Sequence, residues 1–348
     1  MRILVVSDAW FPQVNGVVRT LGTLRTELHK LGHETVFVTP DQFRSMPCPT
    51  YPEIRLAFRP GPKMARTIEA NQPCAIHIAT EGPLGWAARR YCLKRRVPFT
   101  TAYHTKFPEY IQARFRVPLP ISYRVMRRFH GASATIMVAT QTIQDELEQR
   151  GFGRIRRWSR GVDTTLFRPR SAEELAALVP DLVALPKPIF LYVGRVAVEK
   201  NIDAFLSAKL DGSKVVVGDG PQLDELRRKH PSVLFTGAKQ GEELAAHYSA
   251  ASVFVFPSRT DTFGLVLLEA LASGVPVAAY PVPGPLDVIG GSPAGVLNED
   301  LALAAQAALG IPAETCRAHA LGFSWESCTQ QFLANLKPFD PHALDNAA

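Results

Sequence analysis

Short runs of apolar residues alternate along the chain with longer segments in which apolar residues recur at helical spacing. In the first half, the short runs predict strands at residues 3–6, 35–38, 75–78, 99–103 and 135–138. The longer segments predict helices at residues 17–31, 84–95 and 141–150. This alternation is typical of parallel sheets that are covered by helices.

The same alternation starts again in the second half, with strands predicted at residues 189–193, 214–217, 233–236, 253–256 and 275–278. A chain of 348 residues with 46% hydrophobic residues can form two cores. We therefore expect two doubly wound α/β domains, residues 1–165 and 166–324, joined through the Arg- and Pro-containing segment 160–169. A last helix, at about residues 325–336, lies beyond the pattern of the second domain.

Residues 257–277 are the most informative stretch of the chain. Residues 260–262 are of types that cap helices, and leucines then recur at helical spacing. The stretch predicts a helix that begins near Gly264 and ends at Gly274, since glycine is a common residue just past a helix end.

Two acidic residues, Asp261 and Glu269, flank the start of this predicted helix. The amides and the positive dipole end of a helix N-terminus suit a diphosphate, and Glu269 would lie about 7 Å further along the helix axis. That offset is close to the separation between the phosphates and the ribose of a nucleotide. The alternative is that Glu269 belongs to the exposed face of an amphipathic helix.

Two glycine-containing loops follow other predicted strands of the second domain. Arg195 and Lys200 lie after the first of these strands, where two cations can bind a diphosphate and stabilise it as a leaving group. The alternative is a pair of solvated cations. Residues 218–221, Gly-Asp-Gly-Pro, follow the next strand and by themselves indicate only a turn.

The first domain offers weaker signals at the carboxyl ends of its strands, where ligands of open α/β sheets bind. Gly16 follows the first strand and precedes a helix, so its backbone can approach a phosphate, although a plain turn fits equally well. His104 directly follows the strand at residues 99–103 and is expected in a cleft, whereas a lone histidine more often has a structural or surface role.

Charge is distributed unevenly between the two halves. Residues 1–165 contain 25 Lys and Arg against 12 Asp and Glu, whereas residues 166–348 contain 14 against 20. The corresponding net charges are +13 and −6. The first half is therefore expected to meet a negative surface, either nucleic acid or anionic lipid.

Part of this positive charge lies in an amphipathic segment at residues 107–129. Ile121, Val125 and Phe129 repeat every four residues, and arginines occupy the other faces. An anionic membrane is the expected partner, and a packed helix with a solvated basic face is the alternative. Stacking on nucleic-acid bases is also conceivable, but no known nucleic-acid module accompanies the segment. The predicted membrane-facing residues are Arg114, Arg116, Arg124, Arg127 and Arg128.

Other features exclude several classes of site. The apolar start of the chain is too short for a signal peptide, and no apolar run reaches the ~18 residues of a membrane span. Five cysteines without a Cys-x-x-Cys pair indicate neither a disulfide framework nor a zinc site. The sequence has no Asp-x-Asp, so we expect no metal ion and no other cofactor.

The stretch around Asp261 and Glu269 resembles the E-x-x-x-x-x-x-x-E signature of retaining, nucleotide-sugar-dependent glycosyltransferases with the GT-B fold, of the family 4 type. In that family the first acid and the amides of a Phe-Gly-Leu sequence approach the donor sugar, and the second acid binds the ribose. The resemblance gives these roles to Asp261, to Phe263, Gly264 and Leu265, and to Glu269. Here the first acid is Asp rather than the usual Glu, which moves the carboxylate on the order of 1 Å.

Further matches extend the resemblance over nearly the whole chain. His104 matches a first-domain histidine that contacts the donor sugar in the family. The resemblance implies two Rossmann-like domains that face each other across a cleft: an acceptor-side domain, 1–165, to which a terminal helix at about 325–348 crosses back, and a nucleotide-sugar-binding domain, 166–324. The residues that match donor-binding motifs are Gly16, Val17, Gly194, Arg195, Lys200, Gly218, Gly220 and Pro221.

Among such enzymes the chain most resembles those that glycosylate diacylglycerol-type lipids. The resemblance implies α-retaining transfer of a hexose or uronic acid from a nucleotide sugar, with a UDP-sugar favoured, to a membrane lipid such as diacylglycerol. Arg195 and Lys200 would stabilise the departing diphosphate while His104 and Asp261 orient the sugar. We expect same-face attack in which the leaving phosphate oxygen takes the acceptor's proton, with double displacement through Asp261 as the alternative.

The same residues are compatible with a soluble acceptor and a UDP- or GDP-sugar, or with epimerisation of a nucleotide sugar. A non-catalytic membrane- or nucleic-acid-binding protein would explain the basic first half but not the residues around Asp261 and Glu269. We expect the protein in the cytoplasm, associated peripherally with the cytoplasmic face of the inner membrane.

Overall fold

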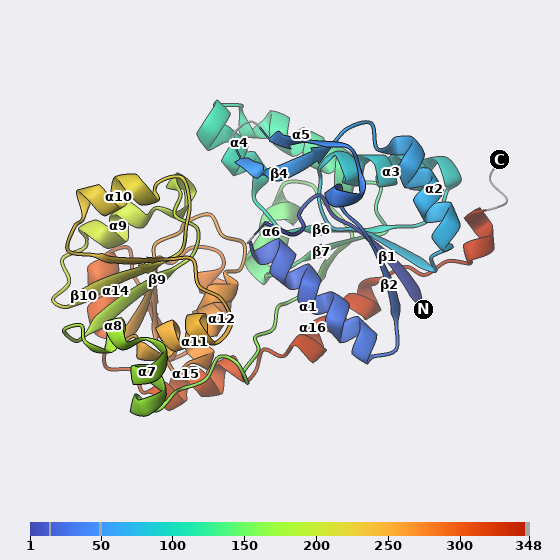
Figure 1. The fold of residues 1–348 in the computed structure, drawn as a ribbon. Helices are drawn as coiled ribbons and strands as arrows, with labels where there is room; N and C mark the ends of the chain where they lie inside the picture. Colours follow the sequence, from blue (N-terminus) through green and yellow to red (C-terminus); the bar gives the residue numbers. More distant parts are fainter. Residues whose placement is uncertain (14, 49–50, 345–348) are drawn as a thin grey trace. The chain divides into compact units, whose positions relative to one another are not determined.

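The computed structural model describes residues 1–13, 15–48 and 51–344 of the chain, with only the backbone of residues 51–53, 113 and 114. The chain forms two compact units (Figure 1). The first contains Met1–Ser159 and the chain from Trp325 onward, and the second contains Arg160–Ser324. The terminal helix therefore belongs to the first unit, although the second unit precedes it in sequence.

The first unit is built on a six-stranded parallel sheet in the order β2-β1-β5-β6-β7-β8. Most of its strands are short, apolar and buried because a parallel sheet covered on both faces has no polar side. The predicted strands are confirmed to within one residue at each end, and β8 is an addition. The strands are β1 (Arg2–Val6), β2 (Glu34–Val38), β5 (Ala75–Ile78), β6 (Thr100–Tyr103), β7 (Thr135–Val138) and β8 (Ile155–Arg157).

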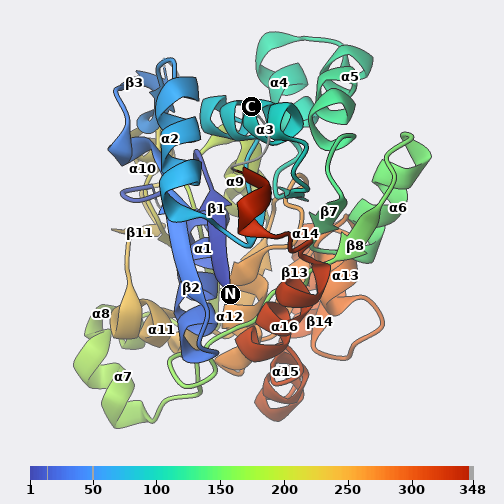
Figure 2. The ribbon, with the colours of Figure 1, turned by 90° about the vertical axis from the view of Figure 1, so that its right-hand side faces the viewer.

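Helices cover both faces of this sheet. Leu4 and Val6 of β1 pack with residues of α2 and α3, whereas Ile3 and Val5 pack with residues of α1 and α16. Successive side chains of a strand point to opposite faces, so each face has its own core. The helices α1 and α16 lie side by side (Figures 1 and 2). The helices of this unit are α1 (Gly16–Lys30), α2 (Gly61–Asn71), α3 (Pro83–Arg95), α4 (Phe107–Phe115), α5 (Leu119–His130), α6 (Gln141–Gln149) and α16 (Trp325–Asn335).

A two-stranded antiparallel hairpin, β3 (Ser45–Cys48) and β4 (Tyr51–Ala57), is part of the first unit and was not predicted. Pro47 and Pro52 interrupt its sequence, and exposed residues such as Met46 and Arg55 replace the apolar run that marks a buried strand. Such an edge hairpin carries little of the hydrophobic pattern on which strand prediction depends.

The second unit repeats the plan with a six-stranded parallel sheet in the order β11-β10-β9-β12-β13-β14. The predicted strands are confirmed, except that the last begins two residues later than expected, after Pro276, which has no N–H to donate to a ladder. The strands are β9 (Ile189–Val193), β10 (Ser213–Val217), β11 (Leu234–Gly237), β12 (Val253–Phe256), β13 (Val277–Ala279) and β14 (Gly295–Leu297).

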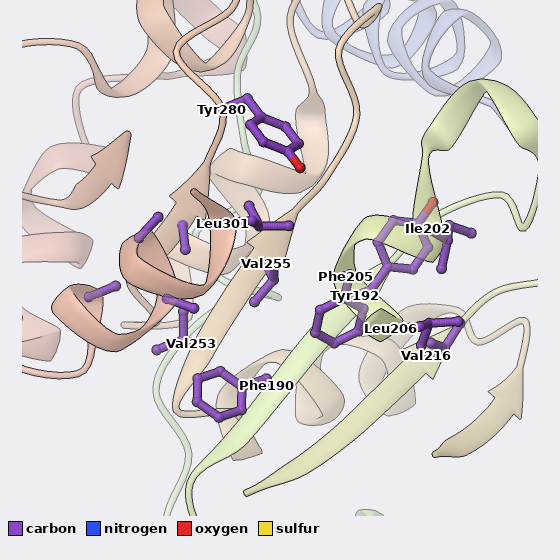
Figure 3. Packing of buried hydrophobic residues seen from close by; sticks show 14 of the residues in the cluster. Phe190, Tyr192, Ile202, Phe205, Leu206, Val216, Val253, Val255, Tyr280 and Leu301 are labelled. Carbon is purple, nitrogen blue, oxygen red and sulfur yellow. The ribbon is translucent and has the colours of Figure 1, made fainter. Parts of the chain in front are cut away.

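The core of the second unit lies between its sheet and the flanking helices. Phe190 and Tyr192 of β9 pack with Phe205 of α9, with Val255 of β12 and with the alanine-rich helix α14 (Figure 3). Among the described helices of either unit, none combines the length and the apolar character needed to cross a membrane. The helices of the second unit are α7 (Ala172–Leu178), α8 (Pro180–Val183), α9 (Ile202–Ser207), α10 (Leu223–Lys229), α11 (Gly241–Ala250), α12 (Leu265–Ala272), α13 (Pro285–Ile289), α14 (Leu301–Ala308) and α15 (Ala313–Ala320).

The boundary between the units falls before Arg160 rather than after residue 165. The guanidinium group of Arg317 donates hydrogen bonds to the carbonyl groups of Thr164, Phe167 and Ala272. These bonds hold the predicted junction segment against the second unit, so residues 160–165 belong to that unit and not to the first. The sequence prediction placed the boundary too late because the partner, Arg317, is more than a hundred positions away.

Candidate active site

The loops that follow β9 and β12 meet in the second unit. Lys200 Nζ lies 2.6 Å from Asp261 Oδ1, so the cation of one loop pairs with the carboxylate of the other. Asn201 Nδ2 donates a hydrogen bond to the carbonyl group of Pro257 at 3.1 Å and joins the same two loops. Because β9 and β12 are neighbours in the sheet, residues 61 positions apart in sequence share one site.

Asp261 is only partly engaged by this ion pair. Its Oδ2 atom is buried and accepts no hydrogen bond from the described part of the chain. The side chains of Lys200 and Asp261 are 21% and 20% exposed. A carboxylate with one paired and one unsatisfied oxygen can accept a hydrogen bond from a hydroxyl group of a bound molecule. The predicted role of Asp261 in orienting a sugar requires such an oxygen.

Two of the predicted donor-binding glycines, Gly218 and Gly220, pack the loop after β10 against the loop after β9. A Cβ atom at Gly218 would lie 1.8 Å from the carbonyl oxygen of Gly194, and a Cβ atom at Gly220 would lie 2.3 Å from that of Val196. Both contacts are far shorter than a Cβ atom allows. The packing of these loops therefore requires glycine at 218 and 220, whether or not these residues also contact a ligand. Pro221 follows, exposed, in the turn before α10.

Helix α12 places Glu269 in the core. The helix begins at Leu265, after Gly264 with φ 85°, and Gly274 with φ 78° follows its end, as predicted. Glu269 is 3% exposed and accepts a hydrogen bond from the buried hydroxyl group of Tyr248 at 2.9 Å. The alternative that Glu269 lies on the exposed face of an amphipathic helix is therefore wrong.

The loop between β12 and α12 lies against the loop that follows β13. A Cβ atom at Gly284 would lie 3.0 Å from the carbonyl oxygen of Asp261 and 3.1 Å from that of Phe263. Phe263 itself is buried. The backbone of residues 261–263 is thus fixed on one side by the loop at Gly284 and on the other by the ion pair with Lys200.

Sequence reasoning missed Arg259, which also holds this loop. Its guanidinium carbon lies 3.6 Å from the ring centroid of Tyr280, and its Nη2 atom lies 2.9 Å from a carboxylate oxygen of Glu299. The hydrogen bond to Glu299 is the main cause that raises the pKa of Arg259. The sequence gives no local signal for it, because Tyr280 and Glu299 lie far along the chain from Arg259.

Arg195 lies at the start of the loop after β9 and is half-buried. Its carbonyl group accepts a hydrogen bond at 2.8 Å from the hydroxyl group of Tyr192, a fully buried residue. Burial raises the pKa of Tyr192, so this hydroxyl stays protonated and continues to donate. This hydrogen bond therefore fixes the backbone at Arg195, in the same loop as Lys200.

In the first unit, His104 follows the carboxyl end of β6, as predicted. Its ring packs edge-on against that of Trp158, with the ring centroids 5.5 Å apart, and Trp158 is fully buried. The half-buried imidazole is therefore held at the edge of the sheet by a core residue and is not a freely moving surface group.

The side chain of Asn15 caps the start of helix α1. Asn15 Oδ1 accepts hydrogen bonds from the amides of Val17 and Val18, both at 3.0 Å. This cap satisfies the amide of Val17, which the predicted phosphate contact at Gly16 and Val17 would use. Asn15 thus has a local structural role at the start of the helix.

A buried carboxylate, Asp8, lies between β1 and α3 and was not predicted. It accepts hydrogen bonds from Thr80 Oγ1 at 2.9 Å and from the amides of Leu84 and Gly85 at 2.8 and 3.2 Å. A Cβ atom at Gly82 would lie 2.3 Å from its carboxyl carbon. Burial outweighs these hydrogen bonds and raises the pKa of Asp8 to about 6. The partners lie more than 70 positions away, so the sequence gives no local signal.

Helix α5 buries Phe129 of the predicted apolar repeat but leaves the other two members of the repeat exposed. Tyr123, Met126 and Phe129 point into the core, whereas Ile121 and Val125 are 57% and 50% exposed. Tertiary packing thus leaves one surface stripe of apolar and basic residues, which we call the α5 stripe: Ile121, Arg124, Val125 and Arg128. Arg116, Arg127 and Phe115 are exposed nearby in sequence, and the side chain of Arg114 lies outside the described residues.

Two family models match the chain. Residues 14–166 match Glycosyltransferase Family 4, and residues 187–311 match Glycosyl transferases group 1. A GDP-mannose-dependent alpha-mannosyltransferase of Mycobacterium tuberculosis is 31% identical over 83% of this chain and 81% of its own length. An alpha-monoglucosyldiacylglycerol synthase of Streptococcus pneumoniae is 31% identical over 80% of this chain and 71% of its own length.

Among solved structures, the sucrose-phosphate synthase of Thermosynechococcus elongatus superposes with a TM-score of 0.77 over 96% of this chain and 97% of that one, at 22% identity. Two parallel-sheet α/β units with this likeness define the GT-B class of glycosyltransferases. The chain belongs to the family 4 glycosyltransferases, and it acts with a nucleotide-sugar donor.

The raised pKa of Asp8 predicts a pH effect on the first unit. Because the folded-state pKa is about 6 and the ordinary value is 3.8, the folded unit holds this proton more tightly than the unfolded chain. The resulting stabilisation, on the order of 3 kcal/mol, is complete below about pH 4 and is lost as the pH rises through about 6. Carbon-13 NMR titration of the aspartate carboxyl groups, with Asp8→Asn to assign the signal, should show a midpoint near pH 6. A midpoint below pH 4.5 would contradict it.

Proposed function

We propose that the protein transfers a hexose or uronic acid, with retention of the α configuration, from a nucleotide sugar to a membrane lipid. The observation that carries the proposal is the joined pair of loops in the second unit, with Lys200 paired to Asp261 and with Glu269 buried on the adjoining helix. These are the groups that the family uses to hold a nucleotide sugar. The names of both relatives, an alpha-mannosyltransferase and an alpha-monoglucosyldiacylglycerol synthase, also support it.

The donor is held by charges of opposite sign. Arg195 and Lys200 bind the diphosphate and stabilise the negative charge that develops on it as it leaves. Glu269 accepts hydrogen bonds from the ribose hydroxyl groups, and Asp261 with His104 orients the sugar. A UDP-sugar is the favoured donor, and GDP-mannose, the donor in the name of the mycobacterial relative, is the alternative.

The ion pair favours the same-face mechanism over double displacement. Lys200 Nζ lies 2.6 Å from Asp261 Oδ1, and a carboxylate paired so closely is a weak nucleophile. In same-face attack, the acceptor hydroxyl forms its bond to the anomeric carbon as the bond to the diphosphate oxygen breaks. That oxygen takes the proton of the hydroxyl group, so no protein base is needed.

The lipid acceptor is supported by the α5 stripe and by the pneumococcal relative, whose name specifies a diacylglycerol product. The first unit would associate peripherally with an anionic membrane through Arg116, Arg124, Arg127 and Arg128, with Ile121 and Val125 entering the interface. A helix with exposed apolar residues between arginines is typical of such a contact. Arg114 remains in the proposal on its sequence position alone.

Removing either proposed cation should impair the chemical step. Arg195→Ala and Lys200→Ala should each lower kcat for nucleotide release by more than ~100-fold while the circular dichroism spectrum stays unchanged. Lys209→Ala, an exposed lysine of the same unit, is the matched control and should keep wild-type turnover. Lys200→Ala combined with Asp261→Asn separates the loss of the cation from the effect of an unpaired carboxylate. Near-full turnover of either single variant would mean that the diphosphate lies elsewhere.

Neutralising part of the basic surface should weaken membrane binding. Arg116→Gln, Arg124→Gln and Arg128→Gln together remove three charges worth about 1 kcal/mol each, so partitioning onto anionic vesicles should fall by up to about 100-fold. Binding of the wild type should also weaken with salt, because the Debye length is only about 8 Å at physiological ionic strength.

The matched control for this test carries the same loss of charge elsewhere on the first unit: Arg66→Gln, Arg90→Gln and Lys94→Gln, all at exposed positions. Cosedimentation with vesicles at low and high salt measures both triple variants. If the two variants pellet equally, the α5 stripe is ordinary solvated surface and a soluble acceptor becomes the better hypothesis.

A further inference from the structure

The first unit contains a cavity of about 520 Å³ that none of the roles above uses. It lies at the carboxyl ends of β1 and β2, the edge at which ligands of open α/β sheets bind. Its walls come from the loop after β1, the turn after β2 and the hairpin β3–β4. Its volume is within the range of about 300–1,000 Å³ that is usual for small-molecule sites.

One wall of the cavity is aromatic and held in place. The ring of Trp10 stacks on that of Phe37 with centroids 4.9 Å apart, and Phe11 meets Trp10 edge-on at 5.3 Å. Phe11 is 62% exposed, an unusual position for so large an apolar side chain. Phe43 completes the wall, and the ammonium group of Lys63 lies over its ring, 5.2 Å from the ring centroid. Such a wall offers contact to carbon chains or to the apolar face of a polyol.

The other wall is polar and mainly basic. Arg55 Nε and Nη2 donate hydrogen bonds to Ser45, at 3.1 Å to its hydroxyl and 2.9 Å to its carbonyl oxygen, so the guanidinium plane is oriented by the hairpin itself. Arg44 adds a second guanidinium group, and Asp41 supplies one carboxylate. Gln13 is 6% exposed, and Asn15 Nδ2 donates to its Oε1 atom at 3.1 Å.

This combination selects for one ligand chemistry. Two guanidinium groups against one carboxylate favour an anion, and guanidinium matches phosphate oxygens in a two-pronged geometry. The aromatic wall requires carbon beside that anion. We propose that the cavity binds a phosphate ester of a small polyol and that this ester is the headgroup of the acceptor. The assignment of the ligand as acceptor rests on the proposed function, and it specifies an acceptor that bears a phosphate group, which diacylglycerol itself lacks.

A phosphate ester of this kind can come from a phospholipid or from a water-soluble polyol phosphate. The hairpin beside the cavity exposes Met46 and Phe58, at 55% and 59%. The amide of Phe58 donates to the carbonyl group of Arg44 at 2.8 Å, so an exposed apolar residue and a cavity arginine are joined directly beside the paired ends of β4 and β3. The hairpin and the helices α4 and α5 also lie on the upper side of the first unit in both views (Figures 1 and 2). Both observations favour the lipid source.

Calorimetric titration of the full chain tests the site directly. The probes are dihexanoylphosphatidylglycerol below its micelle concentration, glycerol 3-phosphate, inorganic phosphate and uncharged dihexanoylglycerol. The wild type should bind the two esters, and Arg44→Gln combined with Arg55→Gln should weaken that binding at least tenfold. Arg66→Gln combined with Arg90→Gln removes the same charge from exposed positions of the same unit and should leave binding unchanged.

The probes also separate the sources of the ester. Tighter binding of the lipid than of glycerol 3-phosphate identifies a phospholipid, and equal binding identifies a water-soluble ester. Inorganic phosphate should bind more weakly than either, because it does not contact the aromatic wall. The inference is overturned if the wild type binds neither ester, if the Arg44/Arg55 variant binds them as well as the wild type, or if inorganic phosphate or dihexanoylglycerol binds as tightly.

Failure here is distinguishable from failure of the proposed function. Nucleoside diphosphate affinity depends on the second unit and should be unchanged in the Arg44/Arg55 variant. If glycosyl transfer is found but the variant has a wild-type KM for the acceptor, the cavity assignment is wrong and the transferase stands. If the esters bind as predicted but no nucleotide sugar is used, the cavity stands and the proposed function is wrong.

Discussion

The contact between Lys200 and Asp261 is the interaction on which the candidate active site depends. It joins two loops that are far apart in sequence and that leave neighbouring strands, β9 and β12. Sheet order thus creates the site, because parallel strands deliver their following loops to the same edge. The glycines at 218 and 220, in the loop after β10, let that loop approach the loop after β9 more closely than any side chain would permit. Glu269 is a second constraint, since a buried carboxylate is costly unless hydrogen-bonded, and Tyr248 supplies such a bond.

Both units follow the same rule, that functional side chains lie where parallel strands end. Each places polar residues just beyond buried strands: His104 and Asp8 in the first unit, and the paired loops in the second. The first unit differs in its excess of positive charge and in two surfaces where arginines adjoin exposed apolar residues, the α5 stripe and the hairpin β3–β4. This division of charge agrees with a donor site in one unit and an acceptor-binding, membrane-facing surface on the other.

Much of the fold could be predicted because buried parallel strands leave continuous apolar runs, which is why strands such as 75–78 and 253–256 were found at their true bounds. The hairpin β3–β4 has no such run and was missed. On α5 the four-residue repeat joined Ile121, Val125 and Phe129, whereas packing buries only Phe129 of these three. The motif residues of the proposed donor site were chosen from local sequence and resemblance. Asp8 and the cavity were not, because their partners meet only through the fold.

The most direct test of the central claim is mass spectrometry of lipids after the protein has been incubated with anionic liposomes and a panel of nucleotide sugars. The account predicts a new lipid heavier by one sugar residue, formed with one nucleotide sugar and absent from the Lys200→Ala reaction. Release of nucleotide without a glycosylated lipid, or no consumption of any donor, would contradict it.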